Sequence, residues 1–243
     1  MGTKRANFTD AQKAQIYVRD RALCSYSGKS LWLLDYGAAP ALTDHVDHVV
    51  PASKGGDAGL ENGVLCTFLH NYVRRDRHPP VRLFNYGLPT LDAFWIFDRI
   101  PAQILHHIDR FAVLRPSDWY FNRAIAQLRW ASAQTDAPKR KDGRHFARGV
   151  EYYCRAAVRQ LRKWRELASA EKGGDLASRG LLPEHPRPDH QMVLLMQTAA
   201  TEKEVESISR ELAPYHEASF AAVEALADVE TELEFPRHSG HFR

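Results

Sequence analysis

One segment in the first third of the chain, residues 42–75, constrains the fold more than any other. Its apolar residues predict a strand over 42–50 that ends before a proline, and a second short strand over 63–66. The polar stretch 52–62 between them contains glycines, which is typical of a loop. A helix is expected over 67–75. The predicted order is therefore strand, loop, strand and helix.

Most of the remaining chain has the hydrophobic periodicity of helices. A first helix is expected over 10–22, where Thr9 or Asp10 can serve as the N-terminal cap. The later helices are expected over residues 90–98, 101–113, 117–133, 144–171 and 200–230. The expected fold class is α+β. Residues 1–80 are predicted to form a small unit with two strands and a helix, and residues 81–243 a mostly helical region.

The composition is that of an ordinary soluble globular protein. The chain has 243 residues, of which 44% are hydrophobic and 26% charged. It contains no run of about 18 apolar residues that could cross a membrane, and its N-terminus lacks the apolar stretch of a secretory signal. Cys24, Cys66 and Cys154 are too few and too scattered for a disulfide framework. A reducing, cytoplasmic location is therefore expected.

The charge is unevenly distributed along the chain. The net charge of +3 is only mildly basic. However, residues 138–165 contain ten lysines and arginines against two acidic residues, whereas glutamates dominate residues 202–234. Such asymmetry is consistent with a face that meets an anionic partner. The alternative is that the acidic C-terminal helices simply pack beside the basic helix.

Four side chains in the first segment suit phosphodiester hydrolysis. This reaction needs a base that deprotonates water and a cation that neutralises the phosphate. The carboxylate of Asp47 and the amide oxygen of Asn71 suit a hard divalent ion, which leaves His48 free to act as the base. Asn62 is expected to hold the loop and support the base. In a regular strand Asp47 and His48 point to opposite faces, so a twist at the strand end would be needed to bring them together.

This segment, DHVDHVVPASKGGDAGLENGVLCTFLHNYVRRD, resembles the HNH endonuclease family, whose fold is the small ββα-metal unit. The resemblance covers about residues 21–75. It rests on the DHVVPxSxGG stretch, on an asparagine fourteen residues after the histidine, and on another asparagine nine residues later. It implies a metal-dependent endonuclease that acts on DNA and leaves a 5′-phosphate and a 3′-hydroxyl. A role in bacterial defence, restriction or mobile elements would be expected for such an enzyme.

The resemblance also implies roles for individual residues. His48 would be the general base, and Asn62 the central structural asparagine of the site. Asp47 and Asn71 would be the ligands of Mg²⁺, or of Mn²⁺ in its place. Basic residues are expected to contact the nucleic acid, namely Lys54, Arg74, Arg75, Lys139, Arg140 and Lys141. A plain turn explains the two glycines beside Lys54 equally well.

One departure from the family pattern concerns zinc. Many HNH proteins bind a structural zinc with two CxxC pairs, but the corresponding positions here read Cys24-Ser-Tyr-Ser27 and Thr67-Phe-Leu-His70. Three of the four thiols are missing, so no structural zinc is expected. The spacing is closer to the zinc-free HNH domain of RNA-guided nucleases, which reads D-x-D-H-[IV]-V-P. His45 stands here at the earlier acidic position of that pattern.

Two other functional classes remain open from the sequence. The chain could be a subunit whose helical C-terminal region docks onto a protein partner in a larger defence complex. It could also be a non-catalytic DNA-binding module that keeps the HNH scaffold. RNA is a weaker alternative substrate. It stays open because the motif does not distinguish ribose from deoxyribose.

Overall fold

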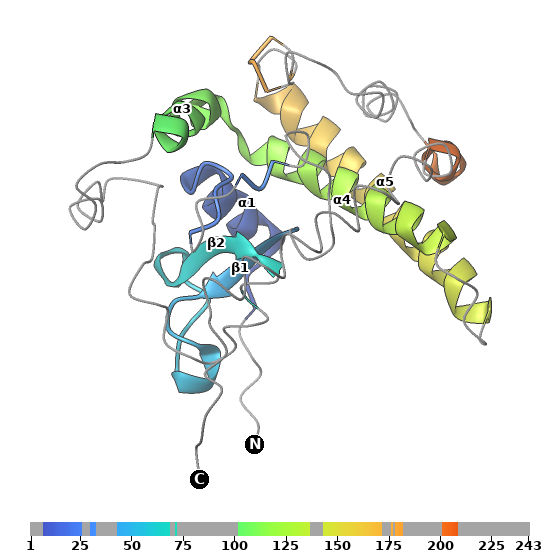
Figure 1. Ribbon diagram of the computed structural model, residues 1–243, viewed down its shortest axis with the longest axis horizontal. Coiled ribbons are helices and arrows are strands. Elements are labelled where there is room, and N and C mark those ends of the chain that lie inside the picture. Colours follow the sequence, from blue (N-terminus) through green and yellow to red (C-terminus); the bar gives the residue numbers. More distant parts are fainter. Residues whose placement is uncertain are drawn as a thin grey trace.

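The computed structural model describes residues 7–25, 30–32, 43–68, 71, 102–136, 143–171, 176, 178–181 and 201–208. This part of the chain combines a small antiparallel sheet with several helices, and the sheet lies beside the helices α1 and α4 (Figure 1). The predicted α+β class is thereby confirmed. Within the described residues, no helix has both the length and the apolar character needed to cross a membrane.

The sheet consists of two strands, β1 (Asp44–His48) and β2 (Gly63–Thr67). They pair in an unbroken antiparallel register that runs from Asp44 opposite Thr67 to His48 opposite Gly63. β1 is shorter than the predicted 42–50. The ladder stops at His48 because the next two residues bond to Asn62 in the connecting loop instead.

Two short 3-10 turns shape the loop between the strands, η2 (Ala52–Lys54) and η3 (Leu60–Asn62). After β2, Phe68 and Asn71 have helical backbone conformation, where the sequence predicts a helix. The rest of that predicted helix, and the one predicted over 90–98, lie outside the described residues.

The first helix, α1, covers Asp10–Arg19 and begins with a capping box. The Thr9 hydroxyl accepts the Gln12 N–H, and the Gln12 side chain accepts the Thr9 N–H. The helix ends three residues earlier than predicted. The reason is that Arg21 and Ala22 take left-handed backbone conformations, with φ of 53° and 52°, which turn the chain back toward β2.

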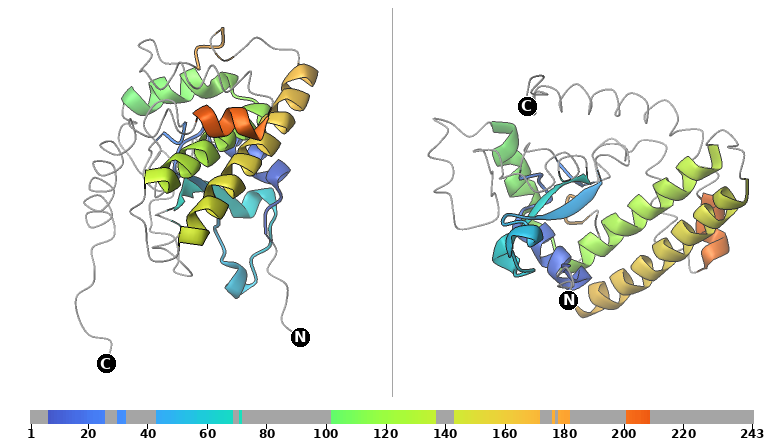
Figure 2. Two further views of the ribbon diagram at one scale, coloured as in Figure 1. Left: turned by 90° about the vertical axis from the view of Figure 1, so that its right-hand side faces the viewer. Right: turned by 90° about the horizontal axis from the view of Figure 1, so that it is seen from below.

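The helical part contains α3 (Ala102–Arg110), the short turn η5 (Phe111–Val113), α4 (Pro116–Asp136) and α5 (Gly143–Ala170). α4 and α5 pack lengthwise against each other (Figure 2). On α5, Cys154, Ala157 and Leu161 recur at helical spacing and are all buried. Residues 202–208 are helical, within the helix predicted over 200–230.

A single hydrophobic core joins the described elements. It contains Ile16 of α1, Val46 of β1, Leu65 of β2 and Phe121 of α4. The described part of the core is thus continuous across residue 80. The division into a unit over 1–80 and a helical region over 81–243 stays a prediction, but the two parts share buried side chains.

Candidate functional site

The loop after β1 is held by the side-chain amide of Asn62. Its oxygen accepts the Val50 N–H at 2.7 Å, while its nitrogen donates to the carbonyls of Val50 at 3.1 Å and Asp57 at 2.7 Å. The Asn62 carbonyl also accepts the Val49 N–H at 2.9 Å. The amide therefore ties together the two ends of the loop and its middle, which is the holding role expected of Asn62 from the sequence.

The two consecutive glycines of the loop, Gly55 and Gly56, are needed for different structural reasons. Gly55 has a φ of +88°, a left-handed conformation that side chains disfavour. Gly56 lies so close to the strand end that a Cβ there would stand 1.8 Å from the Val50 oxygen and 2.8 Å from the Asn62 amide nitrogen. Both glycines are thus required by the loop itself. Lys54, a predicted phosphate contact, is exposed at the end of η2.

Asp47 and His48 lie on opposite faces of β1. The antiparallel ladder includes both residues, so consecutive side chains alternate between the two faces of the sheet. Asp47 shares its face with His45 and is 6% exposed, whereas His48 shares the other face with Val46 and is half-buried. The twist that would bring Asp47 and His48 together is not present within the strand itself.

The surroundings of His48 come from the start of α1. The ring centre of His48 is 4.4 Å from that of Phe8, and the two rings are inclined by 38°. Gly63 pairs with His48 across the sheet, and the space that a side chain at Gly63 would fill is taken by Phe8 and Ile16. The candidate base is therefore packed on one side against apolar groups.

His45 is partly enclosed on the opposite face, where its ring makes an edge contact with Phe68. Burial lowers the pKa of His45 below its ordinary value, and the nearby positive charges of Arg123 and Lys13 act in the same direction. The carboxylates of Asp44 and Asp47 oppose this effect. The net result favours a neutral imidazole beside Asp47.

Asp44 anchors the sheet to α4, a role that its neighbours in the sequence do not indicate. Its buried carboxylate accepts the indole N–H of Trp119 at 3.0 Å and lies 3.6 Å from the Arg123 guanidinium. Arg123 also donates to the Asp44 carbonyl at 3.3 Å. No local pattern signals this contact, because the partners are 75 and 79 residues apart.

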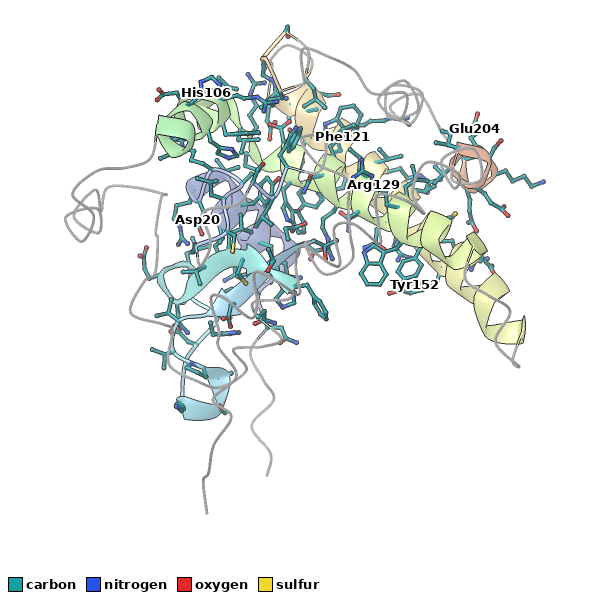
Figure 3. All side chains as sticks on the ribbon, viewed as in Figure 1. Asp20, His106, Phe121, Arg129, Tyr152 and Glu204 are labelled. Atoms are coloured by element: carbon teal, nitrogen blue, oxygen red, sulfur yellow. The ribbon has the colours of Figure 1, made fainter. Side chains whose placement is uncertain are left out.

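A second anchor joins the end of α1 to β2, and Asp20 lies between these two elements (Figure 3). The carboxylate of Asp20 accepts two N–H groups of Arg19 and, at 2.8 Å, the Leu65 N–H. Arg19 reaches further to the carbonyls of Leu60 at 2.8 Å and Gly63 at 2.6 Å. Burial raises the pKa of Asp20, and the Arg19 charge and these hydrogen bonds counteract it.

The positions that correspond to the zinc ligands of many HNH proteins lie among buried side chains, as far as the structure describes them. Leu23 and Ser30 form an isolated antiparallel bridge, and the Ser25 N–H donates to the Leu65 carbonyl at 2.7 Å. Cys24 and Cys66 form no disulfide and have no exposed surface. Ser27 and His70 lie outside the described residues. The absence of a structural zinc stays a prediction, with the donor chemistry as its basis.

The donor types at the candidate metal site fit a hard divalent ion. Asp47 supplies a carboxylate, and Asn71, half-buried on helical backbone four residues beyond β2, supplies an amide oxygen. No group of three or more His, Cys, Asp or Glu side chains that could hold a metal occurs among the described residues. A metal here would thus depend on the two predicted ligands together with water and substrate oxygens.

All but one of the predicted DNA contacts lie beyond what the structure describes, the exception being Lys54. Arg74, Arg75, Lys139, Arg140 and Lys141 lie outside the described residues. On α5, the basic residue Arg155 pairs with two acidic side chains, Glu151 on the same helix and Glu202 of the helical stretch 202–208. At this position the acidic C-terminal stretch packs beside the basic helix, which is the second of the two arrangements that the charge distribution allows.

Comparison of the chain with protein-family models, with curated proteins and with solved structures finds no match. The resemblance to HNH endonucleases therefore rests on the residue pattern between Asp44 and Asp76 alone.

Proposed function

We propose that this protein is a metal-dependent HNH endonuclease that hydrolyses phosphodiester bonds in DNA. The observation that carries the proposal is the loop held by Asn62. From the far end of the segment that follows Asp47 and His48, its amide makes hydrogen bonds to Val50 at the near end and to Asp57 in the middle, so that a carboxylate and an imidazole stand directly before a closed turn. This is the support that a base and a metal ligand need if they are to keep a fixed geometry.

Asp47 and Asn71 would hold Mg²⁺ or Mn²⁺. When bound, the ion neutralises charge on the phosphate and stabilises the departing 3′ oxygen. Because Asp47 and His48 leave opposite faces of β1, the proposal requires the reacting phosphate to bind beyond the end of the strand, where neither side chain would have to cross the sheet.

His48 supplies the base. A ring nitrogen of His48 takes a proton from water as the water oxygen bonds to phosphorus, and the bond between phosphorus and the 3′ oxygen breaks. The 3′ oxygen takes a proton from solvent, and the histidine returns its proton to solvent. The products are a 5′-phosphate and a 3′-hydroxyl.

A plasmid-nicking assay with Mg²⁺ tests the proposal, with His48→Ala compared with the native chain. We expect the rate to fall by a factor of about 10² to 10⁴, because the general base is removed. His45→Ala is the matched control, since it removes the neighbouring imidazole from the opposite face, and it should retain most of the activity. Equal cleavage by the native protein and His48→Ala would contradict the assignment.

The other functional classes give different results in the same assay. A non-catalytic DNA-binding module would retain DNA binding and show no Mg²⁺-dependent cleavage at all. A partner-dependent subunit would be inert alone and active with a protein that co-purifies with it.

A further inference from the structure

The residue before the N-cap of α1 packs directly on the candidate base. The ring of Phe8 lies 4.4 Å from the ring of His48, centre to centre, at an inclination of 38°. Phe8 is only 5% exposed, so its ring is enclosed by the protein and does not lie loosely on the surface. One side of the His48 imidazole therefore meets a fixed aromatic ring.

Gly63 leaves the room that this contact needs. It pairs with His48 across the sheet, and a Cβ at this position would lie 2.4 Å from Ile16 Cδ1 and 3.0 Å from Phe8 Cε1. Real Cβ atoms essentially never come as close as 2.4 Å to another heavy atom. A side chain at Gly63 would consequently displace Ile16 or push the ring of Phe8 away from His48.

The backbone next to Phe8 is tied to the loop of the candidate site. Thr9 donates its N–H to the Gln12 side-chain oxygen at 2.9 Å, and the Gln12 amide nitrogen donates to the Ala58 carbonyl at 2.8 Å. Ala58 follows Asp57, whose carbonyl accepts from Asn62. The start of α1, the loop and His48 are therefore linked into one unit.

From this geometry we infer that Phe8 is a positioning residue for the general base. Its ring restricts the rotation of the His48 side chain and excludes water from one side of the imidazole. A base accelerates proton transfer only while it is held near the productive orientation, so the restriction contributes to the chemical step and not to DNA binding. This inference rests on the proposed function and adds a residue to its machinery.

The kinetic test uses Phe8→Leu in the full chain, with cleavage measured over a range of DNA concentrations. Leucine keeps an apolar side chain but removes the flat ring, so we expect kcat to fall roughly tenfold with KM for DNA unchanged. The matched control is Ile16→Val, which trims the other side chain beside Gly63 without touching the ring contact. It should keep native kcat. Native kcat in Phe8→Leu, with His48→Ala inactive, would overturn the inference and leave the proposed function intact.

A spectroscopic test needs no cleavage activity. In the native protein, NMR should show cross-relaxation between ring protons of Phe8 and His48 and a ring-current shift of the His48 resonances. Phe8→Leu should abolish the ring-current shift, and Ile16→Val should preserve it. Absence of both signals in the native protein would overturn the inference even if the protein cuts DNA. Their presence in a protein that does not cut DNA would instead remove the proposed function.

A second variant covers the case in which Phe8→Leu does not fold. Gly63→Ala keeps Phe8 but places a methyl group where the ring and Ile16 now lie, so it should weaken the ring-current shift and lower kcat in the same direction. Thermal melting identifies which variants are folded. A folded Gly63→Ala protein with a displaced ring and native kcat would contradict the positioning role.

Discussion

At the scale of single residues, Asn62 is held by more hydrogen bonds than any other side chain of the loop. Its amide accepts one N–H and donates to two carbonyls. Only a group with both an acceptor and donors can do this, and an amide is such a group. The adjacent close approach of Gly56 to Val50 shows how tightly the same turn is closed.

Asn62→Asp tests how much this amide stabilises the loop. Asn62→Asp keeps an acceptor for the Val50 N–H but loses both donors and places a negative charge against two carbonyl oxygens. We expect the free energy of unfolding to fall by about 1–3 kcal/mol, as measured by urea denaturation, and cleavage to fall with it.

The reverse substitution, from aspartate to asparagine, at Asp57 of the same loop serves as the control. The exposed Asp57 side chain accepts the Gly59 N–H at 2.9 Å, and Asp57→Asn keeps that acceptor. Its stability should stay close to native. If Asn62→Asp were as stable as Asp57→Asn, the amide would not be what holds the loop.

At the scale of secondary-structure elements, β1 is joined to α4 by a buried polar contact. Asp44 is 5% exposed, and its carboxylate meets the indole N–H of Trp119 and the charge of Arg123. A buried carboxylate is costly unless such partners are present. The contact therefore specifies which helix the sheet packs against.

Trp119→Phe tests this contact. The substitution keeps an aromatic ring in the core but removes the N–H donor, so the Asp44 carboxylate loses one of its partners. We expect a loss of about 1–3 kcal/mol in the free energy of unfolding. The control is Trp130→Phe on the same helix, where the ring packs 5.6 Å from Tyr153. Equal losses in the two variants would show that ring size, and not the hydrogen bond to Asp44, decides the effect.

At the scale of the whole molecule, the strands and helices share one core. Side chains of α1 and of both strands pack with those of α4 and α5 in a single buried cluster. A two-stranded sheet is marginal by itself and needs a helix or further strands against its apolar face. The helical part therefore contributes directly to the rigidity of the candidate site.

A fragment of residues 1–80 should consequently fail to fold alone. It lacks Trp119, Phe121 and the other helical side chains that share a buried cluster with the sheet, so we expect neither cooperative thermal melting nor dispersed NMR signals. The full chain is the control and should show both. A cooperative transition in the fragment would support an independent unit over residues 1–80.

Much of the local structure was predictable from the sequence. The two strands, the capped first helix and the long helices α4 and α5 follow from hydrophobic periodicity and turn residues, whereas the holding role of Asn62 was expected from the needs of the proposed site and from the HNH resemblance. Periodicity and turn signals depend on neighbouring residues alone. The alternation of Asp47 and His48 across β1 is likewise local, because a regular strand always alternates its side chains.

The contacts around the candidate site were decided by the tertiary structure. Phe8 reaches His48, Arg19 reaches the carbonyls of Leu60 and Gly63, and Asp44 meets Trp119 only because α1 and α4 pack against the sheet. A single sequence does not indicate which of its distant residues will come into contact. The sequence alone therefore determined which segments form strands and helices and which reactive residues they carry. The tertiary structure determined which other side chains hold those reactive residues in place. The reason is that such contacts depend on how elements distant in the chain pack against each other.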